Sequence, residues 1–283
     1  SNMSGRLKYY LKLLCGVAGA IYTGITVFLS FWSWDQVGIT GNCCKAWILF
    51  GVIPISAFIS WLILIKTNKR TAWKQGNNAI ILRYGDLHSI AFPTCKKKKN
   101  SKRIVLISMN THFDTLVNNR VVSETSVHGK WINWMKDKGV CPKNLSKRIQ
   151  MAAAEQGINP IRTDEKEGNA KAYQRGTIVE LDFENTRFFL LALSEFDENL
   201  NAQTDRDQII EVIKNICNYY DKHGEGHPMW TPLIGTELSR ANISEYESLM
   251  IMKSMFQLYS EKIHNELSIV VYKKHRNQVS IFE

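Results

Sequence analysis

The sequence predicts an α/β protein built in two parts. An N-terminal two-helix transmembrane hairpin is followed by a three-layer α/β/α domain with a mixed sheet. Two observations support this prediction. Two long uncharged apolar runs, 13–34 and 46–65, stand near the start of the 283-residue chain. In the rest of the chain, short apolar runs alternate with amphipathic segments, which is typical of a sheet covered by helices.

Each of the two apolar runs is long enough to cross a bilayer. A helix rises 1.5 Å per residue, so a run of about 20 residues spans roughly 30 Å, the thickness of the hydrocarbon core. Neither run contains a charged residue, whereas a core helix of a soluble protein usually keeps a polar face. A cleavable signal peptide has a shorter apolar region and lacks a second span. The sequence therefore predicts a transmembrane hairpin over residues 13–65.

The basic residues near the hairpin predict its orientation. Lysine and arginine collect on the cytoplasmic side of membrane spans. We therefore expect a cytoplasmic N-terminal segment over 1–12, a basic linker over 66–77, and both ends of the chain in the cytoplasm. The net charge of +10 suits an anionic membrane surface or an anionic ligand, and by itself it does not indicate nucleic acid. The connecting loop carries Lys45 alone. The basic residues that precede the first run are Arg6, Lys8 and Lys12, and those that follow the second are Lys66, Lys69, Arg70 and Lys74.

The second part, residues 78–283, reads as alternating strands and helices. We expect helices near 131–135, over 145–156 and from 204 to 223, with a last helix opened by a capping box of Ser244 and Glu247. The segments 94–103 and 163–174 read as loops. The expected strands are 79–83, 104–109, an antiparallel pair over 177–183 and 187–193, 229–234 and 267–272.

Cysteine and histidine spacing gives no sign of a metal site. The six cysteines form no C-x-x-C pair, and the seven histidines form no H-E-x-x-H motif. We therefore expect neither a metal site nor a disulfide framework.

Three polar segments follow predicted strands, where open α/β sheets bind ligands. They are 85–87, 110–114 continuing to 126–129, and 232–240. Two of these loops lead into helices, whose free amides and dipole favour an anion. Arg240 adds a positive charge. Two such loops suit a diphosphate.

The order of these segments resembles that of a macro domain, the ADP-ribose-binding module. The matching features are Gly85-Asp86-Leu87, a strand ending at Asn110, a small-residue loop into a helix, and a late P-L-I-G-T. The S-V-H-G-K-W and P-L-I-G-T…S-R segments more specifically resemble the divergent macro domain of membrane-anchored Thoeris anti-phage effectors of the ThsA type. In one branch of that family, two transmembrane helices precede the macro domain, as they do here.

The resemblance implies roles for individual residues. Asp86 would hold the adenine amino group, and Asn110 would lie near the distal ribose. Ser126–Gly129 and Gly235–Arg240 would wrap the diphosphate. The full set of ligand-binding residues that we expect is Asp86, Leu87, Asn110, Thr111, Phe113, Asp114, Ser126, Val127, His128, Gly129, Leu233, Ile234, Gly235, Thr236, Glu237, Leu238, Ser239 and Arg240.

The resemblance also implies a function in antiviral defence. A partner enzyme with a TIR domain would convert NAD into an ADP-ribose-derived signal, a histidine–ADP-ribose conjugate in this branch. The macro domain would bind this ligand, with no other cofactor. The protein would then assemble into a homo-oligomer, and its hairpins would disrupt the bacterial inner membrane and halt the infected cell.

The chain departs from the hydrolytic macro domains at two motifs. Their V-N-A-A-N motif is replaced by Met109–Phe113, so Phe113 stands where the second Asn would be, and their G-G-G-V loop is replaced by Ser126–Gly129. A water-positioning amide and an acidic partner are not evident, so we expect a receptor without catalytic residues. A membrane-tethered ADP-ribosyl hydrolase and a lipid-associated scaffold with a vestigial pocket are the alternatives.

Two residues in these loops invite a closer interpretation. A carboxylate beside a diphosphate is repulsive, so Glu237 either points away or meets a cationic part of the ligand. A single loop histidine such as His128 is more often a hydrogen-bonding or packing residue than a catalytic one.

Overall fold

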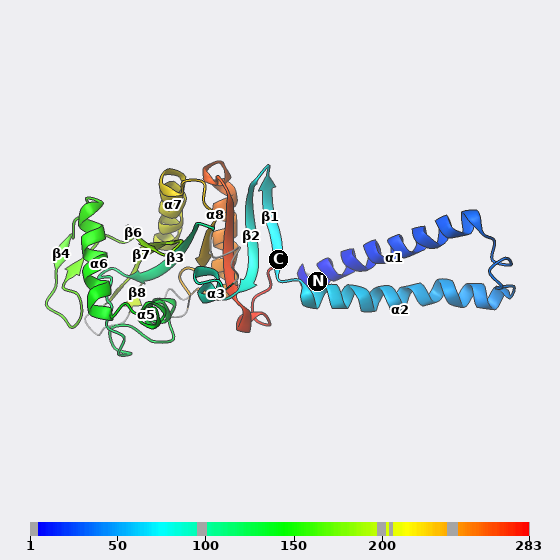
Figure 1. Cartoon of the computed structure of the whole chain (residues 1–283), viewed down its shortest axis with the longest axis horizontal. Coiled ribbons are helices and arrows are strands. Elements are labelled where there is room, and N and C mark those ends of the chain that lie inside the picture. Colours follow the sequence, from blue (N-terminus) through cyan, green and yellow to red (C-terminus); the bar gives the residue numbers. More distant parts are fainter. Residues whose placement is uncertain (1–4, 95–100, 197–201, 204–205, 237–242, 283) are drawn as a thin grey trace. The chain divides into compact units, whose positions relative to one another are not determined.

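The structure of the chain, a computed structural model, describes residues 5–94, 101–196, 202–203, 206–236 and 243–282. It divides into two compact units (Figure 1). The first comprises Ser1–Arg70 with Ser280–Glu283, and the second comprises Thr71–Val279.

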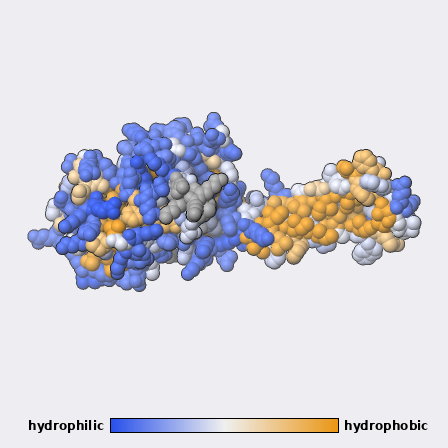
Figure 2. Space-filling view, viewed as in Figure 1, coloured by the Kyte–Doolittle hydropathy of each residue, from blue (hydrophilic) through white to orange (hydrophobic). Residues whose placement is uncertain are grey.

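The first unit contains two long apolar helices, α1 (Gly5–Phe31) and α2 (Asn42–Lys66). The hydroxyl of Tyr22 on α1 donates to the carbonyl of Leu49 on α2 at 2.7 Å. Figure 2 shows a mostly hydrophobic surface along this hairpin. Both helices have the length and apolar composition to cross a membrane. The two predicted helices are confirmed. Each begins before its uncharged run, at Gly5 and Asn42, because polar residues that precede the run also adopt the helical conformation.

The second unit is built on a mixed sheet with the strand order β1-β2-β10-β9-β3-β7-β6. The strands from β2 to β7 along this path run parallel, and β6 pairs antiparallel with β7. The bounds are β1 (Lys69–Gln75), β2 (Asn78–Gly85), β3 (Arg103–Asn110), β6 (Ile178–Phe183), β7 (Thr186–Phe196), β9 (Met229–Pro232) and β10 (Glu266–Tyr272), with β8 (Ala202–Gln203) paired to β7.

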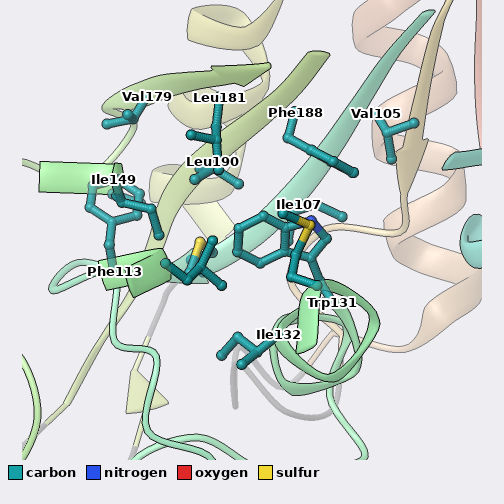
Figure 3. Packing of buried hydrophobic residues seen from close by; sticks show 14 of the residues in the cluster. Val105, Ile107, Phe113, Trp131, Ile132, Ile149, Val179, Leu181, Phe188 and Leu190 are labelled. Carbon is teal, nitrogen blue, oxygen red and sulfur yellow. The ribbon is translucent and has the colours of Figure 1, made fainter. Parts of the chain in front are cut away.

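Helices cover both faces of this sheet. On one face, Val105 and Ile107 of β3 belong to a buried cluster with Trp131 of α5 (Figure 3). On the other face, the ring of Phe189 packs edge-on against Tyr219 of α7, with 5.2 Å between centroids. The predicted three-layer fold with a mixed sheet is thus confirmed. The helices are α3 (Leu87–Ala91), α5 (Val127–Asp137), α6 (Pro142–Glu155), α7 (Arg206–His223) and α8 (Glu245–Leu258), with 3₁₀ turns at Ser260–Lys262 and Lys273–His275.

The region expected to be a basic linker, 66–77, differs from the prediction. Residues Lys69–Gln75 form the edge strand β1, which turns into β2 at Gly76. An edge strand pairs on one side only and tolerates exposed lysines, so its composition resembles that of a linker. The folded domain therefore begins before residue 78.

Two other short elements were not expected. The predicted loop 163–174 overlaps a small hairpin of β4 (Arg162–Thr163) and β5 (Lys171–Ala172). The helix α3 follows β2 directly. Within the predicted loop 94–103, residues 95–100 lie outside the described residues. The helix predicted from 204 to 223 corresponds to α7, and its expected first residue, 204, also lies outside the described residues.

Candidate functional site

A cavity of about 650 Å³ lies where three parallel strands end. Gly85, Pro232 and Tyr272, the last residues of β2, β9 and β10, all line it. This is the edge of the sheet at which open α/β folds bind ligands. The volume suits a ligand the size of a nucleotide.

The cavity wall combines aromatic rings with charged groups of both signs. The ammonium of Lys130 lies 5.0 Å from the centroid of the Tyr272 ring. The rings of His88 and Trp134 lie 5.2 Å apart. The lining residues are Gly85, Asp86, Leu87, His88, Thr125, Val127, Lys130, Trp134, Asp137, Pro232, Leu233, Thr236, Glu245, Val270, Tyr272 and His275.

Five of the predicted ligand-binding residues line this cavity: Asp86, Leu87, Val127, Leu233 and Thr236. Asp86 stands just after β2 and caps α3, where its Oδ1 accepts a hydrogen bond from the amide of His88 at 3.2 Å. A carboxylate has several acceptor positions. Asp86 can therefore cap the helix and still accept a bond from a ligand.

The start of α5 holds its predicted residues in two different roles. Ser126 caps the helix: its Oγ accepts from the amide of Gly129 at 2.9 Å and donates to the carbonyl of Ser123 at 2.6 Å. A Cβ on Gly129 would lie 2.1 Å from that carbonyl oxygen, so the site requires glycine. This cap does not use the amides of Val127 and His128, which remain as first-turn donors for an anion.

The start of α8 also carries a side-chain cap. The amide of Glu247 donates to Ser244 Oγ at 3.2 Å, and the amide of Ser244 donates to Glu247 Oε2 at 2.9 Å. This confirms the predicted capping box. Like the cap of α5, this cap does not use the first two helix amides, here those of Glu245 and Tyr246. The first turn of α8 carries two acidic residues and that of α5 carries none, so an anion in the cavity is favoured at α5.

The turn after β3 is buried and does not reach the cavity lining. Asn110 Nδ2 donates to Asp114 Oδ2 at 3.0 Å, and the Asp114 amide donates back to Asn110 Oδ1 at 3.1 Å. The fully buried Asp114 carboxylate also accepts from Lys166 Nζ at 2.6 Å and from the Asn169 amide at 2.5 Å. The predicted residues Asn110 and Asp114 thus satisfy one another inside the fold.

Thr111 and Phe113, predicted in the same turn, are also buried. The Phe113 backbone has a φ of +48°, and its ring packs against Tyr173 with 5.3 Å between centroids. Figure 3 shows Phe113 within the hydrophobic cluster. Its position gives it a packing role.

His128 is a buried residue in the first turn of α5. Its Nε2 lies 2.7 Å from the carbonyl oxygen of Asp114, which can only accept, so this nitrogen carries the proton. Burial lowers the pKa of His128 to about 4, so the imidazole is neutral near pH 7. These contacts fit the expected hydrogen-bonding and packing role.

The loop after β9 contributes some of its predicted residues to the cavity and buries others. Ile234 is buried, and its carbonyl accepts from the Ser248 hydroxyl at 2.7 Å. Gly235 has a φ of +81°, and a Cβ there would lie 2.1 Å from Ile209 Cδ1. Both positions serve packing, and neither lines the cavity. The predicted residues Glu237, Leu238, Ser239 and Arg240 lie outside the described residues.

Several cavity residues were missed by sequence reasoning. Lys130 and Trp134 follow Val127 at helical spacing, so the periodicity of α5 could have identified them. Tyr272 ends a strand and could have been found by the rule that identified Asp86. The meeting of Glu245 and His275 depends on tertiary structure, for which the sequence carries no local indication. In the described part of the chain, no three His, Cys, Asp or Glu side chains group as metal ligands would.

Comparison with known proteins shows which family the second unit resembles. A family model described as "Thoeris protein ThsA, Macro domain" matches residues 80–272. The "Thoeris protein ThsA" of Bacillus amyloliquefaciens (strain Y2) is 21% identical over 290 residues, which cover 98% of this chain and 89% of that protein.

Two solved structures give weaker likenesses. The Oceanobacillus iheyensis macrodomain with ADP aligns at 11% identity and a TM-score of 0.45, covering 74% of this chain and 91% of that chain. The Trypanosoma brucei macrodomain in complex with ADP-ribose aligns at 9% identity and a TM-score of 0.43, covering 74% of this chain and 71% of that chain.

Proposed function

The chain belongs to the Thoeris ThsA macro domain family, and from this premise we propose that it is a membrane-anchored receptor and effector of anti-phage defence. Its macro domain binds an ADP-ribose-derived nucleotide in the cavity at the ends of β2, β9 and β10. A partner enzyme with a TIR domain makes this signal from NAD, as a histidine–ADP-ribose conjugate. The two proteins act together through that product.

The observation that supports this proposal best is the chemistry of the cavity. Asp86 offers a carboxylate acceptor, which suits the amino group of adenine. The unused amides of Val127 and His128 mark the start of α5, and Lys130 lines the cavity one turn further on. Together they suit a diphosphate, because helix amides and an ammonium both favour negative charge.

We propose that the protein acts as a receptor and not as an enzyme. Asn110 and Asp114, the polar pair after β3, are hydrogen-bonded to each other and buried. Neither is placed to orient a water molecule in the cavity. His128 is neutral and held by a backbone carbonyl. Hydrolysis of an ADP-ribosyl bond remains the competing function and is an outcome of the test below.

The hairpin would carry the response. We propose that α1 and α2 span the bacterial inner membrane with both chain ends in the cytoplasm, as their apolar length and flanking basic residues favour. Ligand binding then promotes assembly into a homo-oligomer, and the assembled hairpins disrupt the membrane. A ligand shifts assembly only by its differential affinity for the assembled state.

The test is a titration of the purified full chain with ADP-ribose and with its histidine conjugate. Calorimetry measures binding, and mass spectrometry identifies the recovered nucleotide. Binding with intact nucleotide supports the receptor, whereas cleaved nucleotide would make the protein a hydrolase. Lys130→Gln should weaken binding, and Lys136→Gln, an exposed position on the same helix outside the cavity lining, should not. A wild-type chain that binds neither ligand would refute the proposal.

A further inference from the structure

The two outermost strands of the sheet carry opposite charge. In the strand order, β1 stands at one end and β6 at the other, and within the described residues each pairs on one side only (Figure 1). Strand β1, with the sequence KRTAWKQ, has three basic residues and no acidic one. Strand β6, with the sequence IVELDF, has two acidic residues and no basic one. The sheet therefore ends in one positive edge and one negative edge.

The negative charge at β6 exceeds the positive charge that its ion pairs supply. The single guanidinium of Arg187 contacts three carboxylates, at 3.5, 3.0 and 2.7 Å respectively: those of Glu180, Asp182 and Glu225. Beside the same strand, Arg148 and Glu155 offset each other. At the opposite edge, Lys69 and Lys74 of β1 are exposed. Each edge thus presents its excess charge to a partner.

A cavity of about 660 Å³ follows β6 and is lined by residues of α6, β6 and α7. Residues 180–182 of the strand line it together with Met151 of α6, whose exposed side chain adds apolar surface. The side-chain amide of Gln156 donates to the Glu180 carbonyl at 3.0 Å and accepts from the Glu180 amide at 3.0 Å. These are the two bonds that a neighbouring strand would make. Gln156 therefore stands in for a strand at this edge.

A second glutamine has a similar place at the β1 edge. Gln257 Nε2 donates to the Ala72 carbonyl at 3.0 Å. A side-chain amide carries the same kinds of donor and acceptor as a peptide unit, so an incoming strand that displaces a glutamine restores the bond. At both edges, a backbone group is held by a partner that can be replaced.

Charge decides which edges suit each other. Two β1 edges would bring lysines and arginines together, and two β6 edges would oppose carboxylates. Like charges opposite each other across strands are destabilising. A β1 edge against a β6 edge instead pairs opposite charges, and the two strands have similar lengths of seven and six residues. The partner that fits each edge is the other edge of a second copy of this chain.

We propose that copies of this chain assemble head to tail by strand addition, with β1 of one copy docking along β6 of the next. The incoming strand displaces Gln156, and its basic side chains meet Glu180 and Asp182. A contact between two different surfaces forms a ring if the rotation closes and an open array if it does not. This inference rests on the proposed function, since it names the surfaces through which the proposed assembly occurs.

The test is light scattering of the full chain in detergent at saturating histidine–ADP-ribose conjugate, over a range of protein concentrations. Asp182→Lys and Lys74→Glu each place like charges across the contact and should raise the concentration for half-assembly by about 10-fold or more. The double variant restores opposite charges and should need less protein than either single variant, whereas independent effects would multiply. Glu211→Lys, an exposed position of α7 outside the β6 cavity, should assemble as the wild type does.

A change of the opposite sign is expected at Gln156. Gln156→Ala removes the side chain that competes for the β6 backbone, so it should lower the concentration for half-assembly by about 2- to 10-fold. A loss of fold stability would not favour assembly in this way. Calorimetry with the same nucleotide checks that each variant is folded, since Gln156, Asp182 and Lys74 do not line the nucleotide cavity.

A lipid surface is the competing partner for the basic strand. Energy transfer between labelled copies is therefore also measured in phosphatidylcholine liposomes with and without phosphatidylglycerol. A loss confined to Lys74→Glu, and seen only with the anionic lipid, would overturn the inference, as would equal assembly of the wild type and both single variants. A wild-type chain that binds the nucleotide and stays monomeric would instead overturn the assembly step of the proposed function, and this inference with it.

Discussion

The buried pair of Asp114 and Lys166 allows a quantitative prediction about the turn after β3. The Asp114 carboxylate is fully buried, and the Lys166 side chain is 13% exposed, with 2.6 Å between Oδ2 and Nζ. Asp114→Asn keeps the shape and removes the charge, so the ammonium loses its anionic partner. Breaking a buried pair on one side costs about 3–5 kcal/mol. We expect the free energy of unfolding to fall by that amount.

The assay is denaturant unfolding of the full chain in detergent, followed by tryptophan fluorescence. Lys166→Met in the Asp114→Asn background should recover part of the loss, because the ammonium that lost the Asp114 charge is then absent. The double variant should lose at least about 1 kcal/mol less than the sum of the single variants. Asp182→Asn is the control: this exposed carboxylate pairs with Arg187 at 3.0 Å, and its loss should cost about 0–1 kcal/mol. A loss below about 1 kcal/mol for Asp114→Asn, or strict additivity, would refute the reasoning.

Three further predictions concern stability. Gly129→Ala places a Cβ 2.1 Å from the Ser123 carbonyl oxygen. It should lower the free energy of unfolding by about 1–2 kcal/mol, which is the overpacking penalty less the gain in helix propensity. Gly51→Ala is the control, because a Cβ at Gly51 meets open space and should not destabilise the protein. The pKa of His128 falls from 6.5 to about 4 on folding, so the unfolded chain binds more protons between these pH values. The free energy of unfolding should therefore fall as the pH drops from 6.5 to 4, by about 1.4 kcal/mol per pH unit. Thermal melts at several pH values should show that His128→Gln loses this dependence. Ser244→Ala should cost about 0.5–2 kcal/mol in thermal unfolding through loss of the cap.

The periodic and apolar elements were predictable from sequence. The runs that became α1 and α2 are defined by the absence of charge, and β3 by six consecutive apolar or small residues. The capping box at Ser244 was predicted from a spacing of three residues. In each case the physical cause is local, so it can be read from the chain alone.

Elements whose identity depends on a neighbour were not predictable in this way. Strand β1 is basic and polar, and it becomes a strand because β2 offers its edge. The helix α3 has five residues and depends on the Asp86 cap. Such short elements have too little local preference to stand out.

The candidate site was predicted in position and only partly in composition. The rule of strand carboxyl ends located the cavity and gave Asp86, Val127 and Leu233. It could not separate cavity side chains from those beneath them, because Asn110 and Asp114 also follow a strand and yet turn inward to each other. Whether a side chain at this edge points into the cavity or into the core depends on how the folded elements pack.

The most direct test of the account is dye release from liposomes that contain the full chain. We predict that the histidine–ADP-ribose conjugate triggers release, that ADP-ribose acts less strongly, and that Lys130→Gln requires more ligand for the same effect. Release that is independent of nucleotide, or tight nucleotide binding without release, would contradict the claim that the cavity controls the membrane hairpin.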